Sequence, residues 1–115
     1  MPMLKAVRIL LVFFLAALVM VASGPGFRTR RHYDEHWQKH GSEFGNINKA
    51  EYLRLAQELR DAPVGGPILE ARRGDIITRF DKRKGYFGAY NADGTIRTFF
   101  IPNQGERYFR RQADR

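Results

Sequence analysis

The spacing of the apolar residues changes once along this chain, and that change constrains the fold more than any other feature. Beyond residue 67, short runs rich in Ile, Phe, Tyr and Thr are typical of strands, and they cover residues 68–72, 76–80, 86–90 and 95–101. The breaks between them hold only three to five residues of turn-forming type. Connections this short allow hairpins only, so the pattern predicts an antiparallel meander of four strands that ends at Pro102.

Two helices are predicted ahead of the strands. The first covers about residues 30–43 and ends at Gly45. The second begins after Asn48, which is a good N-cap, and Glu51 three residues later completes a capping-box-like pattern. Its apolar side chains recur at helical spacing, namely Tyr52, Leu55, Ala56 and Leu59.

Two helices followed by four strands predict an α+β fold with both helices packed on one face of the sheet. Residues 104–115 are predicted to form a basic tail. Tyr108 and Phe109 would attach this tail to the body of the domain.

Residues 1–23 have the pattern of a signal peptide. Lys5 and Arg8 precede an unbroken apolar run of 14 residues, 9–22, which is short for a membrane span. The leader predicts export, to the periplasm or outside the cell, of a domain covering residues 27–115. A single-pass membrane anchor is the alternative, because the uncharged stretch extends to Phe27 and cationic residues, beginning with Arg28, follow it.

The charge of the chain indicates an anionic partner. The formal net charge of the 115 residues is +8, and setting aside Lys5 and Arg8 of the leader leaves +6. A basic surface of this size attracts nucleic acid or anionic lipid, although a merely soluble basic protein would have the same charge. The chain has no cysteine, which excludes disulfides and a thiol nucleophile.

Three histidines recur at one helical face in the first predicted helix. His32, His36 and His40 are spaced i, i+4 and i+8, and Glu43 follows three residues later. Imidazoles titrate near neutral pH, so this stripe is a candidate general acid or base; hydrogen-bonded structural histidines are the alternative. His-x3-His can also bind zinc, but without cysteine or an HExxH motif we expect no metal and no other cofactor.

A wider pattern resembles a known family. It comprises His36-x-x-Lys39-His40-Gly41-x-Glu43-Phe44-Gly45, then Gly74-Asp75 and Phe87-Gly88, then Asp93-Gly94-x-Ile96-Arg97-Thr98-Phe99-Phe100-x-Pro102. Over residues 32–110 the chain resembles the C-terminal toxin domains of bacterial polymorphic and contact-dependent inhibition toxins. These are grouped with barnase, EndoU, colicin D and RelE as small metal-independent RNases. The resemblance implies two N-terminal helices and a four-stranded antiparallel sheet.

The resemblance also implies a site. Nucleases of the colicin D type use a Lys-His pair on the helix, a hydroxyl residue on a late strand and an aromatic residue two positions later. Lys39 and His40 match the pair, Thr98 matches the hydroxyl and Phe100 the aromatic. This chain has threonine where colicin D has serine, and phenylalanine where it has tryptophan, which leaves the subfamily and the target RNA open.

Cleavage of RNA without a metal needs a base, an acid and cations around the phosphorane. We expect His40 to act as acid or base with His36 as its partner, Lys39 to stabilise charge and Thr98 to hold a phosphate oxygen. Phe100 would stack a base.

Two further candidates have structural alternatives. Arg97 would join Lys39 in stabilising the transition state, but a regular strand sends it to the face opposite Thr98, where it would bond a carboxylate such as Glu43. Glu43 itself either orients His40 or belongs to a local network.

Five basic residues are candidates for tracking RNA phosphates, namely Arg72, Arg73, Lys82, Arg83 and Lys84. For the last three, a solvated turn is the alternative.

The sequence therefore supports two hypotheses. The first is an exported, monomeric RNase toxin that cleaves tRNA or another structured RNA in a competitor and is neutralised by an acidic immunity protein. The second is a non-catalytic exported protein that binds an anionic surface or a protein partner. In either case, contact with a membrane would involve only the leader.

Overall fold

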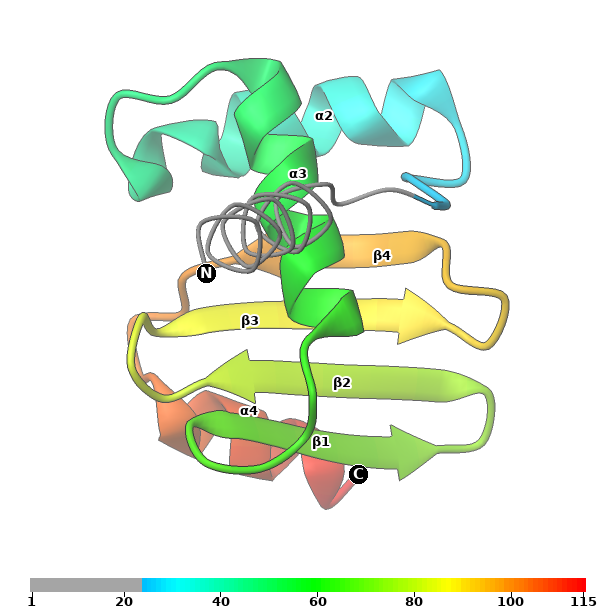
Figure 1. Cartoon of the computed structure of the whole chain (residues 1–115), viewed down its shortest axis with the longest axis vertical. Helices are drawn as coiled ribbons and strands as arrows, with labels where there is room; N and C mark the ends of the chain where they lie inside the picture. The colour runs from blue at the N-terminus through cyan, green and yellow to red at the C-terminus, as the bar shows by residue number, and fades with distance from the viewer. Residues whose placement is uncertain (1–23) are drawn as a thin grey trace, which may run out of the picture.

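The computed structural model describes residues 24–115, which form an α+β fold (Figure 1). In chain order the elements are α2 (Arg30–His40), the 3-10 helix η1 (Gly41–Phe44), α3 (Lys49–Asp61), β1 (Ile68–Arg73), β2 (Ile76–Asp81), β3 (Tyr86–Asn91), β4 (Ile96–Phe100) and α4 (Glu106–Ala113). The strands form an antiparallel meander in the order β1-β2-β3-β4, as predicted.

The predicted leader, residues 1–23, lies outside the described residues. Within residues 24–115 no helix combines the length and the apolar character that crossing a membrane requires.

Side-chain caps start both N-terminal helices. The hydroxyl of Thr29 accepts the N–H of His32 at 3.1 Å, and the side chain of Asn48 accepts the N–H of Glu51 at 2.8 Å. The first helix is shorter than predicted, because at Gly41 the chain tightens into η1. A Cβ atom at Gly41 would lie 2.3 Å from the indole ring of Trp37, so only glycine fits there.

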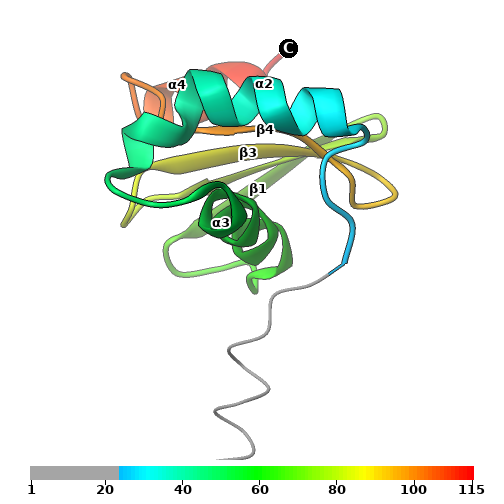
Figure 2. The ribbon, with the colours of Figure 1, turned by 90° about the horizontal axis from the view of Figure 1, so that it is seen from above.

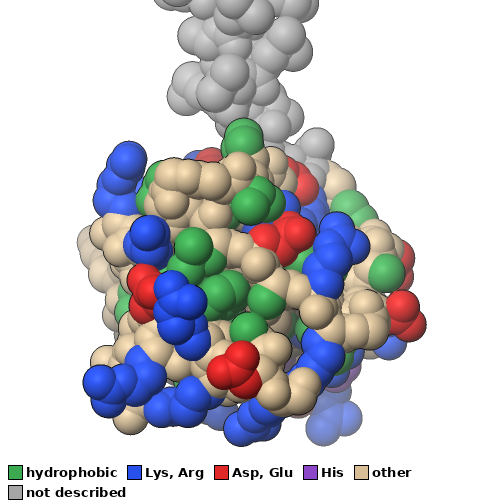
Figure 3. Space-filling model, turned by 90° about the horizontal axis from the view of Figure 1, so that it is seen from below, with side chains coloured by type: hydrophobic (Ala, Val, Ile, Leu, Met, Phe, Trp, Pro, Cys, Tyr) green, Lys and Arg blue, Asp and Glu red, His purple; other side chains and the backbone are tan. Residues whose placement is uncertain are grey.

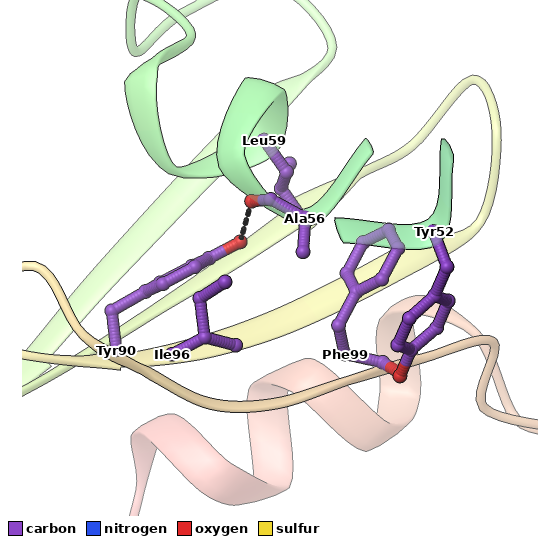
Figure 4. Close-up of a cluster of buried hydrophobic side chains, with 6 residues drawn as sticks. All are labelled: Tyr52, Ala56, Leu59, Tyr90, Ile96 and Phe99. Atoms are coloured by element: carbon purple, nitrogen blue, oxygen red, sulfur yellow. Dashed lines mark hydrogen bonds between the residues drawn. The ribbon is translucent and has the colours of Figure 1, made fainter. Parts of the chain in front are cut away.

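One face of the sheet packs against α3. Figure 4 shows this cluster of Tyr52, Ala56, Leu59, Tyr90, Ile96 and Phe99, all of them buried. The hydroxyl of Tyr90 donates to the carbonyl of Ala56 at 2.8 Å, and that of Tyr52 donates to the carbonyl of Phe99 at 2.5 Å. Burial raises the pKa of both phenols, so each stays a protonated donor that ties α3 to the sheet.

The opposite face of the sheet packs against α4, which corrects two predictions. Residues 106–113 form a helix rather than a basic tail, and the helices therefore lie on both sides of the sheet (Figure 2). The reason is that this face is apolar as well: Phe80, Phe87 and Ala89 are buried there beneath Phe109 of α4. Tyr108 and Phe109 do attach the C-terminal residues to the body, as expected.

The β4 edge of the sheet is covered by α2 (Figure 1) and by the segment that precedes it. The N–H of Ile96 donates to the carbonyl of Gly26 at 2.9 Å, and Phe27 forms a parallel bridge with Ile96. Gly26 and Phe27 therefore belong to the packed body of the domain. This cover protects an otherwise open strand edge.

Phe109→Ala tests the packing of α4. The side chain of Phe109 is 5% exposed, so its removal leaves a cavity between α4 and the sheet. We expect a loss of about 3–5 kcal/mol in the free energy of unfolding, measured by chemical denaturation. Arg107→Ala, an exposed change on the same helix, is the control. Equal stabilities of the two variants would contradict the packing described for α4.

Candidate functional site

A hollow lies between α2 and α4, over the end of β4. We call it the histidine hollow; it has a volume of about 490 Å³ and is lined by Glu35, His36, Lys39, His40, Thr98, Phe100 and Tyr108. The volume is in the range of ligand-binding pockets. α2 and α4 stand on the same side of the sheet (Figure 2), with α2 against β4 and α4 mainly against β1 and β2.

His40 is held by a carboxylate. Its Nδ1 lies 2.7 Å from Oε2 of Glu43, and the other carboxylate oxygen accepts the N–H of Ile101 at 2.9 Å. Because a carboxylate only accepts, the ring proton must be on Nδ1, which leaves Nε2 as the atom able to accept or deliver a proton. The His40 side chain is only 14% exposed. Glu43 therefore orients an imidazole that is largely enclosed.

A second imidazole lies beside the first. Nδ1 of His36 lies 2.8 Å from the backbone carbonyl of His32, which can only accept, so His36 also carries its ring proton on Nδ1. The rings of His36 and His40 are 6.1 Å apart between centroids. Neither Nε2 atom forms a hydrogen bond with a residue that the structure describes. The helical stripe predicted from sequence thus brings two imidazoles to one hollow.

The strand and α4 supply the other walls. Thr98 and Phe100 alternate along β4 and both line the histidine hollow, whereas Phe99 between them is buried against α3. Phe100 stacks on the His40 ring at 5.0 Å and meets the edge of Tyr108 at 5.4 Å. One face of Phe100 is therefore occupied by His40. Sequence reasoning missed Tyr108 as a site residue, because the helical pattern of residues 106–113 was interpreted as a tail.

Lys39 lines the same hollow at the exposed end of α2. It forms no ion pair with any residue that the structure describes. Glu35, one turn earlier, pairs with Arg31 at 2.9 Å. The ammonium group of Lys39 is thus available to an anion in the hollow.

A β-bulge changes the position of Arg97. Ala89 pairs with Thr98 and Tyr90 pairs with Ile96, so Arg97 is an extra residue in β4. Arg97 consequently lines the open face together with Thr98, and the objection based on a regular strand does not apply. The predicted alternative, a bond to Glu43, is wrong: Nη1 of Arg97 donates to the side-chain oxygen of Asn91 at 2.9 Å.

Arg97 does not line the histidine hollow but an adjoining one. We call this the arginine hollow; its polar lining comprises Arg28, His32, His36, Asn91, Arg97 and Thr98. Arg28, His32 and Asn91 were not identified as site residues from sequence, since only the fold brings them to β4. Hydrogen bonds from the side chain and N–H of Thr95 hold the pKa of Asp93 below its usual range, and attraction to Arg28 acts in the same direction.

The other five basic candidates are divided between the two faces. Arg72 and Arg73 line a third hollow under α4, which Arg97 and Thr98 share. Lys84 faces the α3 side, where its ammonium group lies 5.8 Å from the ring of Tyr86. Asp81 accepts the N–H groups of Arg83 and Lys84, so residues 82–84 form an exposed, capped turn.

Basic side chains are not confined to the hollows. Figure 3 looks at the molecule from below, at the β1 end of the sheet, and shows Lys and Arg side chains around much of its rim with Asp and Glu among them. The distribution of charge therefore does not by itself locate a candidate site. The candidate site is defined by the side chains that line the hollows.

No cluster of three or more His, Asp or Glu side chains suited to a metal ion occurs in residues 24–115. Comparison of the sequence with models of protein families and with curated proteins found no match.

Glu43→Ala tests the fixed tautomer of His40. Without the carboxylate the Nδ1 proton has lost its acceptor, so we expect the neutral ring to shift toward the Nε2–H form. Imidazole 15N chemical shifts measure the two tautomers directly. Glu35→Ala, also at the hollow but without a bond to His40, should leave the His40 signals unchanged. An unchanged tautomer in Glu43→Ala would contradict the role of Glu43.

Proposed function

We propose that this protein is a metal-independent endoribonuclease that cleaves RNA by attack of the ribose 2′-hydroxyl on the adjacent phosphate. The observation that carries the proposal is the pair of imidazoles in the histidine hollow, each with Nδ1 bonded and Nε2 free. Two such groups at one phosphate are what proton transfer at the attacking and leaving oxygens requires.

His40 is the better candidate for the base. When Nε2 takes the proton from the 2′-hydroxyl, the ring becomes a cation, and the carboxylate of Glu43 at 2.7 Å stabilises that cation. His36 would start the reaction doubly protonated, with its Nδ1–H donated to the carbonyl of His32. It would deliver its Nε2 proton to the departing 5′-oxygen and become neutral. The products are a 2′,3′-cyclic phosphate and a free 5′-hydroxyl.

Lys39 and Thr98 complete the site from its two walls. The ammonium group of Lys39 would lie against the negative charge that grows on the phosphorane, and the hydroxyl of Thr98 would donate to a phosphate oxygen. Phe100 supports the imidazole of His40 on one side, so base stacking by Phe100 would use its remaining exposed surface. Arg97 lines the arginine hollow and would not contact the reacting phosphate.

The biological context proposed with this chemistry is competition between bacteria. The leader-like residues 1–23 and the resemblance of residues 32–110 to toxin domains support an exported toxin directed at tRNA or another structured RNA. A basic groove of this kind would be blocked by an acidic immunity protein.

His40→Ala tests the proposed chemistry. Total RNA is incubated with the full-length protein in mild detergent and EDTA, and the ends of the fragments are identified. The wild-type protein should leave 2′,3′-cyclic phosphate ends. The variant should be slower by about 10²–10⁴-fold, the usual contribution of a general base.

Gln38→Ala, an exposed change on the same helix, is the matched control, and circular dichroism verifies that both variants fold. Wild-type protein that binds RNA without cleaving it would favour the non-catalytic hypothesis. Cleavage that is undiminished in His40→Ala would exclude His40 as the base.

A further inference from the structure

We propose that the arginine hollow binds the phosphate next to the one that is cleaved, so that the substrate is an RNA strand lying along β4 between α2 and α4. This inference rests on the proposed function, since it extends the same groove by one subsite. It gives Arg97 and Arg28 the role of binding residues rather than catalytic ones.

The two hollows are continuous. His36 and Thr98 line both of them, so a chain of atoms that leaves the histidine hollow enters the arginine hollow directly. Along α2 the hollows are offset by four residues, from His40 and His36 to His36 and His32, which is about 6 Å. That offset is comparable with the separation of neighbouring phosphates in an extended nucleic acid strand.

The lining of the arginine hollow suits a phosphate. It includes two guanidinium groups, those of Arg28 and Arg97, and no carboxylate. Neither arginine forms an ion pair within residues 24–115, in contrast to Arg72 and Arg79, which both contact Glu70. Asp93 influences Arg28 from outside the hollow, and its carboxylate is already bonded to Thr95. The hollow therefore presents two guanidinium groups and no carboxylate of its own, and Asp93 offsets part of the charge of Arg28 from outside.

The position of Arg97 is fixed before any ligand arrives. The bulge in β4 brings it to the open face, and the bond from Nη1 to Asn91 at 2.9 Å holds its guanidinium group. The neutral amide of Asn91 orients the group without cancelling its charge, and the remaining N–H groups can donate to phosphate oxygens. A preorganised arginine loses less side-chain entropy on binding than a free one.

The test uses an RNA oligonucleotide with 2′-O-methyl groups, which cannot be cleaved because the attacking hydroxyl is blocked. Its Kd for the full-length protein is measured by fluorescence anisotropy over a range of salt concentrations. Arg97→Gln and Arg28→Gln should each weaken binding several-fold and reduce the slope of log K against log salt by about 0.7, the contribution of one single-stranded phosphate. Arg54→Gln on α3 is the matched control, with the same loss of charge on the opposite face.

Cleavage kinetics then connect this subsite to the reaction. Wild-type protein should prefer a trinucleotide, which has a second phosphate, over a dinucleotide with the scissile phosphate alone. In Arg97→Gln that preference should be reduced several-fold, mainly through KM.

The possible failures are distinct. If the wild-type protein does not bind the oligonucleotide, or if Arg97→Gln binds it with an unchanged salt slope, the subsite is excluded whatever the cleavage assay shows. If binding depends on both arginines but wild-type protein cleaves no RNA, the hollow is a nucleic-acid site and the proposed catalysis fails.

Discussion

The carboxylate of Glu43 connects the two parts of the chain on which the site depends. One oxygen holds the imidazole of His40 at the end of α2, and the other accepts the N–H of Ile101 just beyond β4. These two residues are 61 positions apart in sequence, so a single side chain sets the helix against the strand at the place where the histidine hollow forms. Stacking of His40 on Phe100 reinforces the same alignment.

The groove exists because the two faces of the sheet are covered unequally. α3 packs on one face along β2, β3 and β4, whereas α4 packs on the other face mainly against β1 and β2. The part of that second face around Arg97 and Thr98 is bounded by α2 at the β4 edge and is left open. Polar side chains at these positions meet solvent without disturbing either hydrophobic cluster.

Features that depend on neighbouring residues were predictable from the sequence. The four strands follow from short apolar runs and turns, and the start of α3 follows from the Asn48 cap. The stripe of His36 and His40 follows from helical spacing alone. In each case the cause lies within a few residues.

Features that depend on distant parts of the chain were not predictable from the sequence. The C-terminal helix forms because Phe109 covers Phe80, a contact between positions far apart in sequence. The bulge at Arg97 depends on how β4 pairs with β3, and strict alternation predicted the wrong face for that residue. Arg28 enters the groove only because the segment before α2 pairs with Ile96.

Binding of RNA in the groove between α2 and α4 is tested most directly by backbone amide chemical shifts during titration with a 2′-O-methyl RNA oligonucleotide. The largest changes should fall at residues 36–40 of α2, along Ile96–Phe100 and at Tyr108, with little change along α3. Changes centred on Lys49–Asp61, with the groove residues unaffected, would place the binding surface on the opposite face and contradict the assignment of the groove.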